Sequence, residues 1–161
     1  MSDTRKRFSV QSDNSSYFVE GYINENADFK KIEVGEGKLR LNLEQVEYIN
    51  SIGCKNWLTM IDRVKSMDIE YHAVSIAMMT AISMLPGLLP PGGKGAIKSF
   101  ILPYYCLNCN QDMTLKISPE ELKVVDGSAF VDMHACVHCG NPAVITEENS
   151  EYLYLYVEEI D

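Results

Sequence analysis

The last third of this chain is organised by two short stretches, YYCLNCN at residues 104–110 and HACVHCGNP at residues 134–142. Each contains a Cys-x-x-Cys pair, and 26 residues separate the two pairs, which are Cys106 with Cys109 and Cys136 with Cys139. A turn of this kind points both thiolates at one position, and two such turns supply four sulfur ligands in the tetrahedral arrangement that suits zinc. The spacing therefore predicts a structural zinc site with four cysteine ligands.

The spacing does not distinguish zinc from iron, because a rubredoxin-type iron site uses the same four ligands. An iron-containing electron carrier is therefore an alternative function. Two disulfides fit poorly, since four of the five cysteines have metal-site spacing. A redox Cys-x-x-Cys motif usually occurs singly, at the start of a helix. His134 and His138 flank the second pair, but four cysteines already complete the coordination of zinc.

The charge of the chain is distributed very unevenly. Residues 1–100 carry 12 Lys and Arg against 12 Asp and Glu, whereas residues 101–161 carry 2 against 11 and hold the whole formal net charge of −9. A zinc ion with four thiolates adds two further negative charges. The metal-bearing part should therefore repel phosphate backbones, which disfavours a second alternative, binding of nucleic acid or the transcription machinery through this part.

The composition is typical of a cytoplasmic protein. No apolar run follows the basic residues 5–7, so the pattern of a secretory signal is missing, and cysteines in metal-site spacing suit a reducing compartment. The uncharged stretch Ala73–Pro90 is 18 residues long, but two prolines and a glycine interrupt it and it is short for a membrane span. We interpret it as a buried strand followed by a helix.

Residues 8–103 alternate between strand and helix patterns. Leu39, Leu41 and Leu43 occupy every second position, which predicts a strand with one apolar face. Five large apolar residues recur at intervals of three and four in the next predicted helix, namely Trp57, Leu58, Ile61, Val64 and Met67. Further strands are predicted at residues 8–11, 17–23, 69–76 and 96–105, and further helices at residues 24–32 and 77–85.

Residues 104–161 are expected to form a small all-β zinc ribbon. Strands that lead into and out of the cysteine turns are predicted at residues 113–117, 129–134, 143–146 and 152–157. Ser118 followed by Pro119 is typical of a helix start. Gly140 should allow the second cysteine turn to fold back beneath the metal, because glycine tolerates a positive φ.

The stretch from Leu39 to Trp57, LRLNLEQVEYINSIGCKNW, resembles the STAS family of bacterial anti-sigma-factor antagonists. The family signature is an alternating strand, the pattern v-x-y-i-D-S-S/T-G and an amphipathic helix. The resemblance implies an α/β fold, a mixed β-sheet with helices on one face, over residues 1–103, followed by the ribbon over residues 104–161. It also implies a non-enzymatic, cytoplasmic signalling protein that binds an anti-sigma factor or a kinase-like regulator.

Two departures from the family pattern affect the predicted function. The switching members carry a phosphorylated Ser or Thr immediately before the glycine, where this chain has Ile52, and Asn50 replaces the signature aspartate. Asn50 and Ser51 can instead cap the following helix. We therefore predict that Asn50, Ser51, Ile52 and Gly53, with the face of the following helix, bind a protein partner without a phosphorylation switch.

The chain shows no Ser-His-Asp, Cys-His or paired-carboxylate pattern that would indicate catalysis. Four thiolates would also close the coordination shell that a catalytic zinc keeps open. In the STAS family a final helix packs where the ribbon stands in this chain. That flank needs cover from the ribbon, from a partner or from a second copy in a homodimer.

Overall fold

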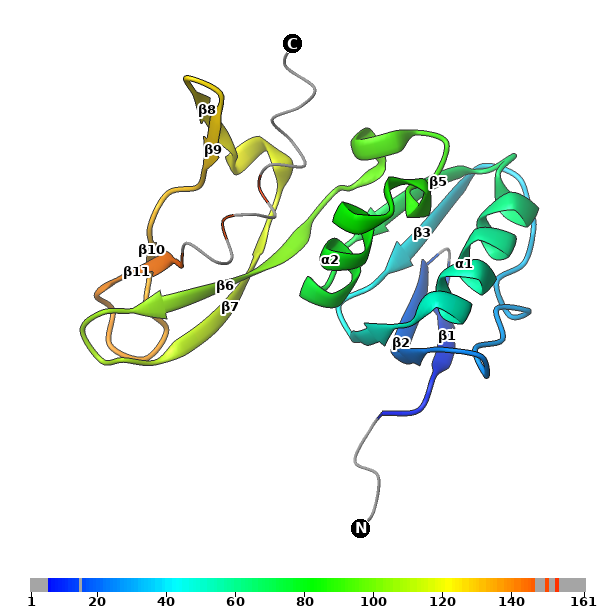
Figure 1. Ribbon diagram of the computed structural model, residues 1–161, viewed down its shortest axis with the longest axis horizontal. Coiled ribbons are helices and arrows are strands. Elements are labelled where there is room, and N and C mark those ends of the chain that lie inside the picture. The colour runs from blue at the N-terminus through cyan, green and yellow to red at the C-terminus, as the bar shows by residue number, and fades with distance from the viewer. Residues whose placement is uncertain (1–5, 15, 147–149, 151–152, 154–161) are drawn as a thin grey trace. The chain divides into compact units, whose positions relative to one another are not determined.

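The computed structural model describes residues 6–14, 16–146, 150 and 153. The chain divides into two compact units, Met1–Phe100 and Ile101–Asp161 (Figure 1). The boundary predicted after residue 103 falls inside strand β6, which spans Phe100–Cys106. The first unit is mixed α/β, and the second contains a small antiparallel β region that carries the cysteine pairs, as the sequence predicts.

The first unit is built on a mixed five-stranded sheet. Its strands are β1 (Ser9–Asp13), β2 (Ser16–Ile23), β3 (Lys38–Asn42), β4 (Val46–Ile49) and β5 (Asp68–His72). The order is β1-β2-β3-β5, with β4 also paired to β2. Strands β1 and β2 form an antiparallel hairpin, whereas β3 and β4 lie parallel to β2, and β5 lies parallel to β3. The predicted strand at residues 69–76 stops early, because Ala73 adopts a positive φ of 49° and α2 begins shortly afterwards.

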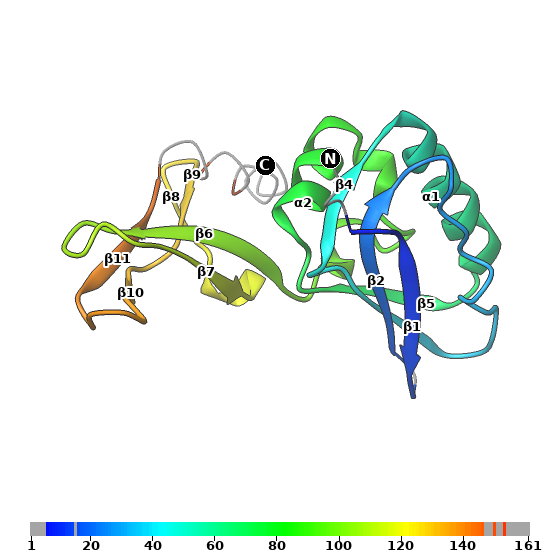
Figure 2. The ribbon, with the colours of Figure 1, turned by 90° about the horizontal axis from the view of Figure 1, so that it is seen from below.

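Two helices, α1 (Ser51–Val64) and α2 (Ile76–Met84), cover one face of this sheet (Figures 1 and 2). The apolar face predicted from the alternating leucines is buried, with Leu39, Leu41 and Leu43 no more than 1% exposed. Trp57 of α1 is fully buried and its ring packs edge-on against Tyr71 of β5. The predicted apolar stripe of α1 holds in part. Trp57, Ile61 and Val64 are buried, together with Met60, whereas Leu58 is 38% exposed and Met67 lies beyond the end of the helix.

A buried hydrogen-bond network connects α1 to the segment after α2. The indole Nε1 of Trp57 donates to the Tyr71 hydroxyl over 2.9 Å and to the Leu88 carbonyl over 3.2 Å, and the Tyr71 hydroxyl donates to that carbonyl over 2.6 Å. Leu88 ends the 3-10 turn η1 (Pro86–Leu88), and a second such turn, η2 (Gly93–Ala96), follows. The network satisfies every polar atom it contains, which a buried polar cluster requires.

The helix predicted at residues 24–32 is wrong, because this segment forms turns. The side chains of Asn24 and Asp28 accept hydrogen bonds from backbone N–H groups two residues further on, at 2.9 and 3.0 Å. Such local bonds compete with helix formation. The Arg63 guanidinium of α1 then donates to the carbonyls of Phe29 and Ile32, at 2.9 and 2.7 Å. A side chain from another element thus satisfies backbone groups that a helix would have paired.

The sheet face opposite the helices carries a compact charge network centred on Glu70. The Glu70 side chain is 10% exposed and lies 2.7 Å from the Lys38 ammonium, 2.8 Å from the His72 ring nitrogen and 3.4 Å from Nε of Arg40. Burial alone would raise the pKa of this carboxyl, but the hydrogen bonds and charges of Lys38 and His72 outweigh it and lower the pKa to about 2.

The second unit contains a four-stranded sheet in the order β10-β11-β6-β7 and a separate hairpin. The sheet strands after β6 are β7 (Asp112–Ile117), β10 (His134–Ala135) and β11 (Pro142–Ile145). The hairpin pairs β8 (Lys123–Val125) with β9 (Ser128–Phe130), and its turn residues Asp126 and Gly127 both adopt positive φ, at 51° and 76°. An Asp-Gly pair of this kind is a strong hairpin signal that our sequence analysis did not use.

Other predictions for the second unit hold in part. Residues 129–134 form no continuous strand, since β9 ends at Phe130 and β10 starts at His134. The helix start at Ser118 produces only the 3-10 turn η3 (Pro119–Glu121), although its capping box is present. Of the predicted strand at residues 152–157, the structure describes only Leu153, which is buried and is not in a strand. No helix in the described part of the chain is long and apolar enough to cross a membrane.

Candidate metal centre

The two Cys-x-x-Cys turns have the same backbone hydrogen bonds. In the first, the Cys106 N–H donates to the Gln111 carbonyl over 3.0 Å, and the Asn110 N–H donates to the Cys106 carbonyl over 2.9 Å. In the second, the equivalent bonds run from Cys136 to Asn141 over 2.7 Å and from Gly140 to Cys136 over 2.9 Å. We call these two turns, residues 106–111 and 136–141, the knuckles. Their shared geometry is set locally, within six residues of sequence.

Each knuckle closes through a residue in the left-handed backbone region. Gly140 has a φ of 77°, as predicted, and Asn110 occupies the equivalent position in the first knuckle with a φ of 56°. Asn is one of the few residues other than glycine that enter this region readily. Asn110 was not among the predicted residues, although its place four residues after Cys106 matches that of Gly140 after Cys136.

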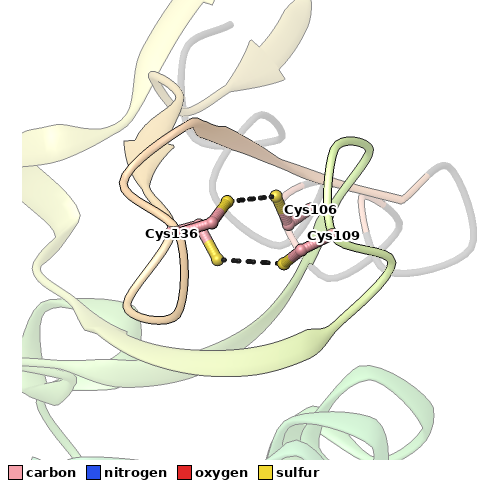
Figure 3. A group of neighbouring side chains, drawn as sticks. Cys106, Cys109 and Cys136 are labelled. Atoms are coloured by element: carbon pink, nitrogen blue, oxygen red, sulfur yellow. Dashed lines mark hydrogen bonds between the residues drawn. The ribbon is translucent and has the colours of Figure 1, made fainter.

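The knuckles bring all four predicted cysteine ligands together (Figure 3). Their Sγ atoms lie within 4.8 Å of one another, with 3.5 Å between Cys106 and Cys139 and 3.7 Å between Cys109 and Cys136. A tetrahedron with metal–sulfur bonds of about 2.3 Å has sulfur–sulfur edges of about 3.8 Å, so these separations fit a metal ion at the centre. They are far longer than the roughly 2.05 Å of a disulfide, and all five cysteines are free.

Polar N–H groups surround the sulfurs of the second knuckle. The Asn141 side chain donates to Sγ of Cys139 over 3.4 Å, the Asn108 side chain donates to the same atom over 3.6 Å, and the His138 backbone N–H donates to Sγ of Cys136 over 3.4 Å. The bonds from Asn141 lower the pKa of Cys139 to about 6, and the bond from His138 lowers that of Cys136. Donors of this kind stabilise thiolate, the form that binds a metal.

The sulfurs of the first knuckle have a different environment. Cys106 is buried and Cys109 is half-buried. Burial, together with the neighbouring thiols, raises the pKa of Cys109 to about 12. A bound cation favours thiolate at such a position, because its positive charge outweighs the cost of burial. The cluster is thus chemically suited to a soft divalent cation with a complete sulfur shell, the arrangement of a structural site.

The two histidines beside the second cysteine pair are not members of the sulfur cluster. The His134 ring packs edge-on against Tyr104, with 5.3 Å between ring centroids, and its Nε2 lies 3.8 Å from the Glu121 carboxylate. His138 is exposed and contributes its backbone N–H to Cys136. The side chains of Asn108 and Asn141, which were not predicted from the sequence, are the ones that donate directly to a cluster sulfur.

The structure places the four residues predicted to bind a partner at the start of α1. Asn50 is the N-cap, and its side-chain oxygen accepts a 2.7 Å bond from the Gly53 N–H. Ser51 is exposed, and the Ile52 side chain is 52% exposed. Gly53 is buried against β2, where a Cβ atom would lie 2.0 Å from the Ile23 carbonyl oxygen. These residues therefore combine a capped helix end with one exposed apolar side chain.

Cys54, the fifth cysteine, is half-buried on α1, outside the metal centre. Burial raises the pKa of the Cys54 thiol, so it stays protonated at neutral pH. This environment fits the role of a small apolar side chain rather than that of a nucleophile.

Comparisons of the chain with models of known protein families, with curated proteins and with solved structures found no match. The description of the mixed sheet with its two helices, and of the four-cysteine cluster, therefore comes from the structure alone. The metal cluster provides the most specific chemistry among the described residues.

Proposed function

We propose that this protein is a non-enzymatic, cytoplasmic protein-binding module in which a structural zinc ion holds the second unit together. The observation that carries the zinc proposal is the group of four sulfur atoms within 4.8 Å of one another. Zinc imposes no coordination geometry of its own, so it suits the tetrahedral arrangement of four thiolates. A zinc ion with four thiolate ligands has no open coordination position for a substrate. The Asn108 and Asn141 donors add the outer support that metal sites commonly have.

Metal content and visible absorbance of the purified full chain test this part of the proposal. We expect a colourless protein with about one zinc per chain. Iron in the same ligand set would make the protein red and would support an electron carrier instead. Purification without any transition metal, under conditions that keep thiols reduced, would contradict both interpretations.

Cys136→Ser provides a sharper test, with Cys54→Ser as its control. Cys136 is buried in the sulfur cluster, so its loss should abolish metal binding and unfold the second unit, which contributes few buried apolar side chains of its own. Cys54→Ser removes a thiol outside the cluster and should keep the metal. Hydrogen exchange on the two variants, both purified with zinc present, should show lost protection in β6 and β11 for Cys136→Ser alone. Equal metal content in the two variants would refute the assignment.

We further propose that the surface beginning at Asn50–Gly53 docks a regulatory protein. The support is the resemblance of residues 39–57 to the STAS signature and the exposed apolar side chain of Ile52 beside a capped helix end. Because Ile52 has no hydroxyl, phosphorylation cannot switch the surface at this position. The expected partner is an anti-sigma factor or a kinase-like regulator, bound constitutively.

Ile52→Asp tests this docking surface by introducing a negative charge where the family carries a phosphate. The change should leave the fold intact, because an acidic residue in the first turn of a helix is favourable. Val34→Asp is the matched control, since Val34 is also 52% exposed in the first unit but lies in the loop between β2 and β3 rather than at the start of α1. We expect affinity capture from the native lysate to recover a signalling protein that Ile52→Asp releases and Val34→Asp retains. Equal recovery with both variants would contradict the docking surface.

A further inference from the structure

The tips of the two knuckles carry an exposed pair of aliphatic side chains. Leu107 follows the first cysteine of its knuckle and is 70% exposed, and Val137 follows the first cysteine of the other knuckle and is 69% exposed. Both positions lie in tight turns whose shape comes from backbone hydrogen bonds and from the cysteines, so neither side chain contributes to a core. Folding gives no reason for branched aliphatic residues at these two positions.

The metal centre fixes the separation of these two side chains. The four sulfurs lie within 4.8 Å of one another, and each aliphatic residue is bonded directly to one of the ligands. Consecutive Cα atoms are about 3.8 Å apart, so the two residues are close enough for one partner to contact both within a standard patch of about 800 Å². The adjoining Asn108, Asp112 and His138 are exposed and polar. An apolar centre with a polar rim is the usual anatomy of such a patch.

The charge of the second unit narrows the kind of partner. Residues 101–161 carry 11 acidic residues against 2 lysines, and one of those lysines, Lys123, is paired with Asp132 at 2.7 Å. Four thiolates with a divalent ion make the centre itself negative. Nucleic acids and anionic membranes would be repelled. A second copy would bring together two surfaces of the same sign, which is also unfavourable.

We propose that the knuckle tips, Leu107 and Val137, form a docking surface for a protein whose own surface has an apolar recess bordered by lysine and arginine. The two aliphatic side chains anchor the contact, and the negative charge of the unit attracts and orients the basic rim. This surface lies in the second unit and does not depend on the surface at Asn50–Gly53. It requires the metal centre, because the cysteines hold the two knuckles together.

Site-specific photo-crosslinking tests the proposal. A photoreactive amino acid replaces Leu107 in the metal-loaded full chain, cross-linking is performed in the native lysate, and the linked segment is identified by mass spectrometry. That segment is then synthesised as a labelled peptide, and its affinity for the unmodified chain is measured by fluorescence anisotropy. We expect a segment rich in lysine and arginine whose affinity falls at least tenfold between 50 and 300 mM salt, as screening of the charges requires.

The variants separate this surface from the one in the first unit. The double variant Leu107→Asn and Val137→Asn changes only exposed side chains, so it should keep its metal and its circular dichroism, yet bind the peptide at least tenfold more weakly. Val34→Asn and Ile52→Asp should bind the peptide like the wild type. A cross-link to nucleic acid, to an acidic segment or to a second copy would overturn the proposal. So would the absence of any cross-link, or unchanged binding by the double variant.

Discussion

Gly53→Ala should destabilise the first unit, although alanine is the better helix former. Gly53 lies in the first turn of α1, where the helix backbone packs tightly against the end of β2. An added Cβ would lie 2.0 Å from the carbonyl oxygen of Ile23 and 2.6 Å from its carbonyl carbon. Both atoms belong to the backbone of a paired strand, so no flexible side chain can move out of the way.

The structure allows the size of this effect to be worked out. Ordinary contact requires 3.4 Å or more, so helix and strand would have to separate by about 1.4 Å. Overpacking of this kind costs about 1–3 kcal/mol or more. The shift would also stretch the 3.1 Å bond from the Asn50 N–H to the Ile23 carbonyl, which contributes about 1 kcal/mol. Replacing glycine in a helix gains at most about 1 kcal/mol. The net expectation is a loss of about 1–3 kcal/mol.

Urea unfolding followed by tryptophan fluorescence is the appropriate assay. The chain has a single tryptophan, Trp57, and it is fully buried in the first unit, so its emission reports that unit alone. Gly87→Ala is the control, because a Cβ at Gly87 would meet nothing within 4 Å. The control should change stability by less than about 0.5 kcal/mol. If Gly53→Ala were as stable as the wild type at an unchanged m-value, the close approach of α1 to β2 would be refuted.

Three further predictions concern the interactions described for the first unit. Glu70→Gln should lower stability at pH 7. The difference in stability from wild type should shrink as the pH falls from about 4.5 towards 2, because the pKa of the folded Glu70 carboxyl is lowered to about 2 and its stabilising contribution is lost on protonation. Unfolding curves measured across this pH range would show this loss. Trp57→Phe should lower the free energy of unfolding, followed by circular dichroism, by about 2–3 kcal/mol, against about 1 kcal/mol for Tyr71→Phe. Replacing Trp57 removes two buried hydrogen bonds and leaves a cavity, whereas replacing Tyr71 removes hydrogen bonds but keeps an aromatic ring in place. Arg63→Met keeps most of the apolar part of the side chain but removes two hydrogen-bond donors. It should lower the free energy of unfolding by about 1–3 kcal/mol and speed hydrogen exchange in residues 29–32. Unchanged exchange there would mean that the turns of this segment do not depend on Arg63.

The metal centre was predictable from sequence because its geometry is local. The hydrogen bonds of each knuckle span four or five residues, and the left-handed residue stands at the same offset in both, at Asn110 and Gly140. A pattern of cysteines therefore contains nearly all the information that the turn needs. The Asn108 donor is harder to predict, because it reaches Cys139 on the other knuckle, 31 positions away.

The predicted helix at residues 24–32 failed for the opposite reason. Spacing of apolar residues suggested a helix, and Phe29 and Ile32 are indeed buried. The conformation, however, depends on side-chain bonds within the segment and on Arg63, which is more than 30 residues away in the chain. Burial followed from the apolar pattern, whereas the backbone followed from hydrogen bonds that the pattern does not encode.

The exposed apolar residues connect the fold to the proposed functions. Ile52, Leu107 and Val137 all stand in turns or helix starts whose backbone is already fixed by short-range hydrogen bonds. Polar residues would serve the fold equally well at such positions, because the side chains reach no core. An aliphatic residue there adds exposed apolar surface without adding stability, and binding is the process that removes such surface from water. The same reasoning does not extend to Gly53, whose identity the packing of α1 on β2 fully accounts for.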